Sequence, residues 1–292
     1  MIDRFERLHP LITFLYFGGA LALFILMLHP LFLSAAFFLI LLLHLLKDRG
    51  RSLNQWLFFM LTSGLFLFLL NPLFNERGRH VLFVVFQHRF TLEAFVYGGM
   101  SAISVMSVIA LFVSYNEAMT PNKLLFLFSK FLPQFAVLLM LTLRFIPLMK
   151  RRAEEIIAIQ SSKGIIAAHG PLRNKLKTGM LFIQALLVYS LEEAIQTADS
   201  MKARGYGQGK RSSYEYFSFK KTDWFAGIYL AVLFIVITYG RQNGYGYLTV
   251  YPLLEDWRLT GKDAVILVFE CLYISFPLVV HIGGSLRWRI LS

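Results

Sequence analysis

The chain is poor in charged residues. Asp, Glu, Lys and Arg make up 16% of its 292 residues, whereas hydrophobic residues make up 57%. This composition excludes an intrinsically disordered chain and is typical of a polytopic membrane protein. Cysteine is scarce as well: Cys271 is the single one, so an intramolecular disulfide is excluded.

Motifs for local catalytic or metal chemistry are absent from the sequence. No Gly-x-x-x-x-Gly-Lys-[Ser/Thr] stretch is present, so the chain lacks a P-loop, and any ATP involved would be bound by a partner. The seven histidines form no His-x-x-His or His-x-x-x-His pair, which predicts no local metal site. The doublets Glu154-Glu155 and Glu192-Glu193 lie on predicted helices, where adjacent side chains do not face each other. We interpret them as exposed acids that balance nearby basic residues, and we expect no catalytic residue, metal or cofactor on this chain.

Six apolar runs are each near the roughly 20 residues that a hydrocarbon core requires. They predict an all-α, polytopic membrane protein of about six transmembrane helices, since a helix satisfies its own backbone groups in lipid. The first run follows Arg4 and Arg7 but precedes no small-residue cleavage site, so we interpret it as a retained span. Glu270, inside the last run, is costly in lipid and requires a partner or water. The runs are 11–28, 30–46, 54–73, 92–114, 223–240 and 263–283.

Lys and Arg are distributed unevenly about these runs. With the N-terminus inside, 23 of the 29 fall on the inner side, 16 of them from Ser114 to Lys221, and six fall on outer loops. The positive-inside rule then predicts that both termini are cytoplasmic. The formal charge of +12 is therefore a topological signal that favours the anionic lipid bilayer as a partner, and no basic stripe with interleaved aromatics points to nucleic acid.

The most basic segment contains two long predicted helices, which we term the first arm (134–164) and the second arm (171–205). Each begins apolar, becomes charged, and finishes on a basic residue followed by glycine. At about 1.5 Å of rise per residue, they are rods of roughly 45 to 50 Å. Gly164 and Gly205 suit the left-handed position that ends a helix, whereas Pro147 predicts a kink within the first arm.

The apolar stretches of the arms, 135–149 and 180–191, leave the topology open. If only the first stretch crossed the membrane, the segment 150–221 would be external, and it contains 13 Lys and Arg. If both stretches crossed, the segment 150–177 would be external, and it contains seven Lys and Arg. Both cases oppose the charge bias, so we expect a hairpin whose apolar halves pack on one another in or under the inner leaflet.

Three regions and two flanking elements follow from this pattern. We expect a four-helix membrane region at 1–114, a cytoplasmic module containing the arms at 115–221, and a two-helix membrane region at 222–292. Asn122–Leu132, between two prolines, predicts a short amphipathic helix that lies in the membrane interface or connects buried elements. After the second arm, Asp223 is the predicted N-cap of the next span.

Each arm ends on a short basic motif, Ser162-Lys163-Gly164 on the first and Ala203-Arg204-Gly205 on the second. A guanidinium at the tip of a protruding helix offers a planar fork to carboxylates or carbonyls of a partner. The helix dipole alone also favours a cation near a C-terminus. Because the pattern occurs on both arms, we interpret the two motifs as docking sites.

Several motifs together resemble the transmembrane T component of energy-coupling-factor (ECF) transporters, the CbiQ-like family. The likeness covers essentially the whole chain, and its specific part runs from Arg144 to Tyr206. It rests on Arg144-Phe-Ile-Pro147, Arg152-Ala-Glu-Glu-Ile156, Leu191-Glu-Glu-Ala194, Lys202-Ala-Arg-Gly-Tyr206 and, at the end of the third span, Asn71-Pro-Leu-Phe74.

The resemblance implies a scaffold of a bacterial or archaeal cell membrane that is not itself an enzyme. It would link two ATP-binding-cassette (ABC) ATPase subunits, which bind the ATP, to a small substrate-binding membrane protein, the S component. The cargo would be a vitamin, nickel or cobalt. The arms would be coupling helices, with the apolar faces 135–149 and 180–191 cradling the S component. The residues implied to dock on the ATPases are Ser162, Lys163, Gly164, Ala203, Arg204 and Gly205.

One position departs from the family pattern, and two other function classes remain as alternatives. Lys163 stands where the family usually has arginine, and a lysine lacks the bidentate fork. One alternative is a polytopic membrane enzyme, for instance a transferase that uses Glu154, Glu155 and the cytosolic basic cluster on a lipid-linked substrate. The other is a permease with its own path, for which the spans contain few polar residues.

Overall fold

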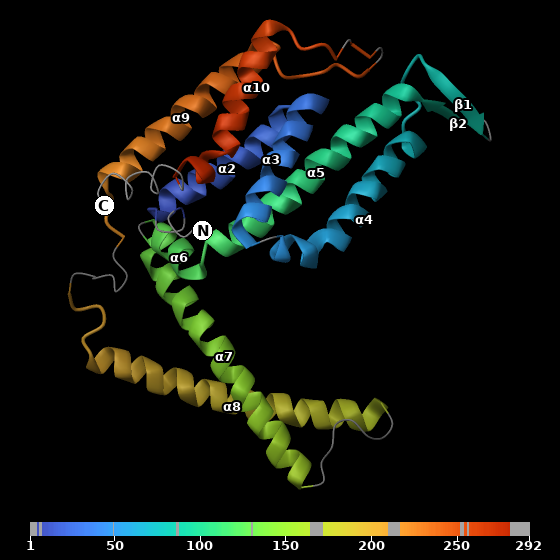
Figure 1. The fold of residues 1–292 in the computed structure, drawn as a ribbon. Helices are drawn as coiled ribbons and strands as arrows, with labels where there is room; N and C mark the ends of the chain where they lie inside the picture. The colour runs from blue at the N-terminus through green and yellow to red at the C-terminus, as the bar shows by residue number, and fades with distance from the viewer. Residues whose placement is uncertain are drawn as a thin grey trace. The chain divides into compact units, whose positions relative to one another are not determined.

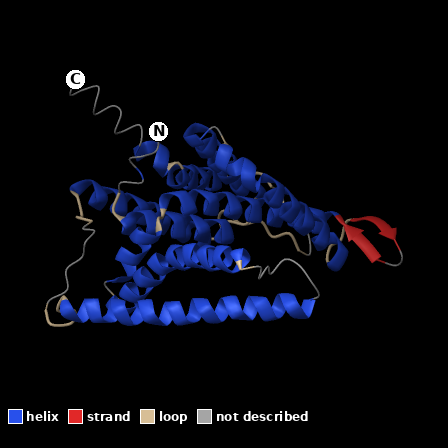
Figure 2. Ribbon diagram, turned by 90° about the horizontal axis from the view of Figure 1, so that it is seen from below, coloured by secondary structure: helices blue, strands red, loops and turns tan. Residues whose placement is uncertain are grey.

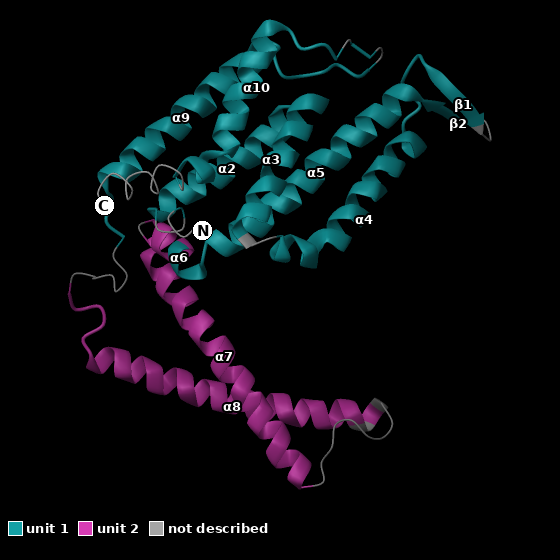
Figure 3. Ribbon diagram, in the orientation of Figure 1, with its two compact units in different colours: residues 1–123, 217–292 teal, residues 124–216 magenta. Residues whose placement is uncertain are grey.

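Two compact units make up the chain (Figure 3). The first is formed by Met1–Lys123 with Phe217–Ser292, and the second by Leu124–Tyr216. Helix α6, Pro121–Ser129, includes the sequence boundary between them. The computed structural model describes residues 5, 8–48, 50–85, 88–129, 131–163, 172–209, 217–251, 254–255 and 257–280.

Helices dominate both units, which confirms the prediction of an all-α polytopic membrane protein (Figure 1). A two-stranded antiparallel hairpin, β1 (Val81–Val85) with β2 (His88–Thr91), was not predicted (Figure 2). The second unit contains α7 (Pro133–Ser162) and α8 (Leu172–Ala203). The first contains α2 (Pro10–Leu26), α3 (Pro30–Asp48), α4 (Arg51–Phe74), α5 (Leu92–Ala118), α9 (Lys221–Gln242) and α10 (Gly261–Ile274).

The helices that are long and apolar enough to cross a membrane differ from the predicted set. Within the described residues they are α3, α4, α5, α7, α8 and α9, while α2 is a shorter apolar helix. The predicted span 263–283 begins in α10, is interrupted at Ser275 and continues as helix to residue 280, and residues 281–283 lie outside the described part. Both arm helices therefore qualify by length and composition, and that they do not cross the bilayer stays a prediction based on charge.

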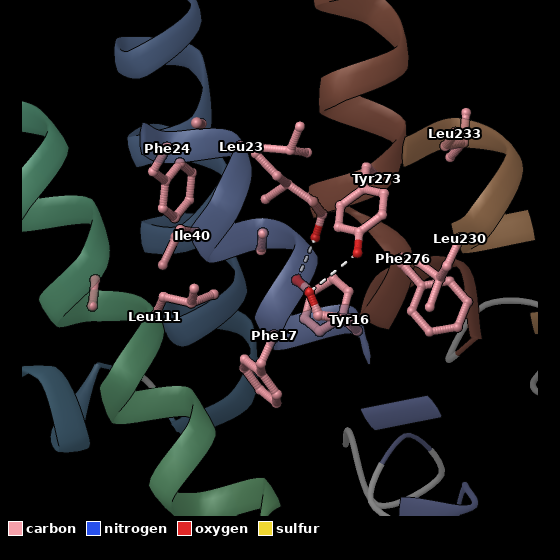
Figure 4. Close-up of a cluster of buried hydrophobic side chains, with 14 of the residues drawn as sticks. Tyr16, Phe17, Leu23, Phe24, Ile40, Leu111, Leu230, Leu233, Tyr273 and Phe276 are labelled. Carbon is pink, nitrogen blue, oxygen red and sulfur yellow. Dashed lines mark hydrogen bonds between the residues drawn. The ribbon is translucent and has the colours of Figure 1, made fainter. Parts of the chain in front are cut away.

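The core of the first unit lies between α2, α3, α5, α9 and α10 (Figure 4). Close to its centre, the rings of Tyr16 and Tyr273 stack with centroids 5.9 Å apart. The Tyr273 hydroxyl donates to the carbonyl oxygen of Leu15 at 3.2 Å and so ties α10 to α2. Other large core side chains are Leu23, Phe24, Ile40, Leu111, Leu233 and Phe276.

A second tyrosine bond compensates for the end of α10. The N–H of Leu278, which would bond to Ile274 in a continued helix, donates instead to Ser275 at 2.9 Å. The Tyr16 hydroxyl donates to the carbonyl oxygen of Ile274 at 2.8 Å. A buried carbonyl without a donor is costly, so Tyr16 stabilises the interruption that precedes Pro277.

Two glycines allow α4 and α5 to approach closely. A side-chain carbon at Gly98 would lie 2.9 Å from the carbonyl oxygen of Phe68, and one at Gly64 would lie 2.6 Å from the sulfur of Met106. Both distances are below van der Waals contact. At Gly98 the neighbour is backbone, so a larger residue there would push the helices apart, whereas at Gly64 the Met106 side chain would have to move. Small residues at helix contacts are the usual solution where lipid supplies no hydrophobic drive between helices.

Histidine-proline pairs begin two helices. His9 is the N-cap of α2, and its Nδ1 accepts the N–H of Leu11 at 3.2 Å. In the same way, Nδ1 of His29 accepts the N–H of Leu31 at 3.3 Å at the start of α3. Each following proline occupies the first helical turn, where a missing N–H costs no helical bond.

The prediction that Asp223 is the N-cap of α9 is wrong. Lys220 is the N-cap, and Asp223 is the third helical residue, whose carboxylate accepts the Lys220 N–H at 2.8 Å. A carboxylate at this position reaches back to the N-cap amide, so the acid stabilises the helix start from inside it. Asp223 also accepts the His9 N–H at 3.3 Å, which joins the starts of α9 and α2.

Two histidine-carboxylate pairs support the β-hairpin. His80 Nδ1 lies 2.8 Å from Glu93 Oε1, which also accepts the backbone N–H of Arg79 at 3.2 Å. His88 Nδ1 lies 2.7 Å from Glu76. The two pairs thus join residues of the hairpin and its flanks, His80 to Glu93 of α5 and His88 of β2 to Glu76.

The surface of the first unit is apolar along α4 and α9. Phe58 and Phe74 of α4, and Trp224 and Phe225 of α9, are all at least 65% exposed. Large apolar side chains of this kind suit hydrocarbon rather than water. Inside the unit, Glu270 of α10 is almost completely buried, and its Oε1 has no hydrogen-bond partner among the described residues.

Candidate docking site on the two long helices

Helix α8 ends in a hydrogen-bonded turn. The N–H of Tyr206 donates to Met201 at 3.0 Å, and the N–H of Gly205 donates to Lys202 at 2.9 Å. This pair of bonds is a Schellman motif, which requires a left-handed residue directly after the C-cap. Gly205 has a φ of +77°, so the prediction of a left-handed glycine at this end is confirmed.

The capped turn places Arg204 at the tip of α8. Its backbone N–H donates to Ser200 at 3.1 Å, which continues the helical pattern up to the residue itself. Arg204 and Ala203 are both exposed. In the described part of the chain, the guanidinium has no ion pair or hydrogen bond, so it is available to a partner.

The end of α7 is built differently. Lys163 is its exposed C-cap, and the Lys163 N–H donates to Gln160 at 3.1 Å. The hydroxyl of Ser162 donates to the carbonyl oxygen of Ile159 at 2.7 Å and so satisfies one group of the last turn. Gly164 and Pro171, which were assigned a helix end and a helix start, lie outside the described residues. Helix α7 is continuous through Pro147.

The two arm helices cross each other (Figure 1). Where they meet, the guanidinium carbon of Arg152 lies 4.5 Å from the centre of the Tyr189 ring. On its own helix, Arg152 donates to Glu155 Oε2 at 2.6 Å. The Tyr189 hydroxyl donates to Glu193 Oε2 at 3.4 Å. A cation over an aromatic face is attracted by the ring quadrupole, so the contact links α7 to α8.

Most side chains of the apolar halves of the arms are exposed within this unit, and the expectation that these halves pack on one another stays a prediction. Ala136 is the single buried residue described in α7. On α8, Met180 and Leu191 are 69% and 64% exposed. Many large apolar side chains of both arms are therefore uncovered within this unit.

One member of each acidic doublet accepts a hydrogen bond from its own helix, Glu155 from Arg152 and Glu193 from Tyr189. Glu155 bonds to Arg152, three residues earlier, which confirms the interpretation that it balances a basic residue at helical spacing. Among the residues that the structure describes, no group of three His, Cys, Asp or Glu side chains could hold a metal ion. Tyr189 was missed by the sequence analysis, because an aromatic residue inside an apolar run carries no signal of a contact with another helix.

Comparison with known proteins identifies the family. The family model described as cobalt transport protein, CbiQ, matches residues 3–215 of this chain. The chain belongs to the CbiQ family. Its multi-pass helical architecture is that of a membrane component, in keeping with a family of transport proteins.

Curated relatives of this CbiQ-family chain include proteins named energy-coupling factor transporter transmembrane protein EcfT. The one from Lactobacillus helveticus is 26% identical over 176 residues, which is 55% of this chain and 62% of the relative. The one from Lacticaseibacillus paracasei is 29% identical over 101 residues, 34% of this chain and 38% of the relative. An uncharacterized protein of Mycoplasma pneumoniae is 28% identical over 129 residues, 44% of this chain and 29% of the relative. This chain thus spans less than two thirds of each of these relatives.

Proposed function

We propose that this chain is the transmembrane T component of an ECF-type ABC importer. It couples ATP hydrolysis by two partner ATPases to the reorientation of a small S component that carries a vitamin, nickel or cobalt. The chain itself binds neither ATP nor the nutrient. The CbiQ family match and the EcfT names of its relatives support this assignment.

The observation that carries the proposal is the pair of exposed basic tips on two long crossing helices. The Schellman turn holds Arg204 at one tip with its guanidinium free among described residues, and Lys163 is exposed at the other. A guanidinium that projects from a rigid helix end suits a groove lined by carboxylates or carbonyls. The docking residues are those of the two tip motifs, 162–164 and 203–205.

The uncovered apolar faces of the arms fit a hydrophobic partner. On the first arm they include Phe135, Leu138 and Ile146, and on the second Met180 and Leu187, all at least half exposed. Exposed apolar surface of this extent marks an interaction site for a protein or for lipid. In the proposal, the S component occupies these faces, and movement of the arms tilts it so that its cargo faces the cytoplasm, where both termini lie.

The two tips are not equivalent in their chemistry. Lys163 offers a point charge, whereas Arg204 offers a planar fork with paired donors. The two ATPase contacts therefore differ in strength, with the tighter one at the second arm.

A mild-detergent pull-down of the tagged chain from its native membranes, with mass spectrometry of the co-purified proteins, tests the assignment. We expect two ABC ATPase subunits and a small hydrophobic protein, whose identity indicates the cargo. Recovery of a folded chain without any ATPase would refute the scaffold assignment. Turnover of a lipid-linked substrate by the purified chain alone would favour an enzyme instead.

A further inference from the structure

The crossing of α7 and α8 depends on a small cluster of side chains. Arg152 of α7 lies over the ring of Tyr189 of α8 at 4.5 Å. Each of the two is held on its own helix by an acid, Arg152 by Glu155 at 2.6 Å and Tyr189 by Glu193 at 3.4 Å. Each of the two side chains is therefore also held by a hydrogen bond on its own helix.

Charged residues flank the crossing on both helices. Helix α7 carries Lys150-Arg151-Arg152 and Glu154-Glu155 there, and α8 carries Glu192-Glu193 just beyond Tyr189. The contact of Arg152 with Tyr189 joins the two helices at this point.

Because the tips lie far from the crossing, a small change in the crossing angle moves them by several ångströms. From Arg152 to Ser162 the helix rises about 15 Å, and from Tyr189 to Ala203 about 21 Å, at 1.5 Å per residue. A change of about 10° in the crossing angle then displaces the tips by about 3 to 4 Å. Such a displacement exceeds the distance tolerance of a hydrogen-bonded docking contact.

We propose that Arg152 and Tyr189 are positioning residues that set the angle between the arms, so that both tips engage two ATPase subunits at the same time. This inference rests on the proposed function. Two linked contacts bind more tightly than either alone only when geometry permits simultaneous engagement. Neither side chain touches an ATPase in this arrangement, and the contact acts by holding Lys163 and Arg204 at a matched separation.

Variants of the two residues separate the ring contact from packing. Tyr189→Leu removes the aromatic face but keeps apolar bulk, whereas Tyr189→Phe keeps the face and loses only the hydroxyl. Arg152→Lys keeps the charge and loses the planar stacking group. Arg151→Gln is the matched control, since Arg151 is exposed and forms no described contact at the crossing.

The first readout is the separation of the arms in the full-length chain. Spin labels on cysteines at Ser161 and Asp199, both exposed, report the distance by pulsed electron resonance in a Cys271→Ser background. We expect Tyr189→Leu and Arg152→Lys to broaden the distance distribution, and Tyr189→Phe and Arg151→Gln to preserve it. An unchanged distribution in Tyr189→Leu, with normal elution on gel filtration, would overturn the inference.

The second readout is retention of the ATPases by the same unlabelled variants. An exposed cation–π contact has an energy that corresponds to a change of about two- to fivefold, so we expect Tyr189→Leu to lower retention by that factor and Tyr189→Phe to restore it. Equal retention in Tyr189→Leu and Tyr189→Phe would refute the positioning role while leaving the proposed function standing. Absence of ATPases from the unsubstituted chain would refute the proposed function, and the distance measurement would still report on the contact.

Discussion

Substitution of Gly205 by alanine tests whether the geometry of the second tip matters. The left-handed φ of +77° costs a residue with a side chain roughly 1 to 2 kcal/mol. The added carbon would meet only the side-chain oxygen of Gln208 at 3.5 Å, an ordinary contact, so the cost comes from the backbone and not from a clash. The equilibrium ratio of the capped turn to its frayed form should therefore fall by a factor of about 5 to 30.

Hydrogen exchange of the full-length chain in lipid nanodiscs measures this loss directly. The amides of Arg204, residue 205 and Tyr206 are protected by bonds to carbonyls of the last turn, so they should exchange about 5 to 30 times faster in Gly205→Ala. Gly205→Asn should recover part of the protection, because asparagine tolerates the left-handed region. Gly209→Ala is the control, since a side-chain carbon there meets nothing within 4 Å.

The same variants measured for ATPase retention connect the turn to docking. Gly205→Ala should lower retention, because fraying moves the Arg204 guanidinium out of its fixed direction. Unchanged exchange in Gly205→Ala would refute the strain argument. Faster exchange with full retention would show that docking does not depend on the capped geometry, and the role assigned to this tip would then be wrong.

Three further predictions concern the tips, the membrane unit and pH. Arg204→Glu should abolish most ATPase co-purification while the chain elutes normally, whereas Lys163→Arg should retain ATPases at least as well as the unsubstituted chain; the reverse order would contradict the docking assignment. Gly98→Ala should lower the free energy of unfolding in detergent by about 1 to 3 kcal/mol, because the added carbon would lie 2.9 Å from the backbone oxygen of Phe68. The neighbouring Gly99→Ala, whose added carbon has its nearest contact at 3.9 Å, should leave the free energy of unfolding unchanged. Burial lowers the pKa of His29 below its ordinary 6.5, with Asp263 opposing the shift, so the unfolded state binds the extra proton and stability should fall as pH drops below about 6.5. His29→Asn keeps a cap acceptor and should remove this dependence in thermal-shift measurements, and an equal dependence in that variant would exclude His29 as its source.

The sequence predicted the features that depend on short stretches of chain. The class of the protein, the two long helices and the left-handed Gly205 follow from apolar runs and end signals that act within a few residues. The same local signals were insufficient at Asp223. The helix begins three residues earlier than predicted, so Asp223 lies inside the first turn and Lys220 is the N-cap. They also missed the β1–β2 hairpin, whose support comes from pairs such as His80 with Glu93.

By itself, the sequence determined the membrane character, the arms with their basic tips, and the motifs that place the chain in its family. All three depend on residues that are close together in the sequence, so they can be recognised without the tertiary fold. Only the tertiary structure decided that the arms cross at Arg152 and Tyr189, that Gly98 lies against the backbone of α4, and that Tyr16 completes the interrupted end of α10. Each of these joins different helices, and its energy depends on a distance and an orientation that no local pattern of residues encodes.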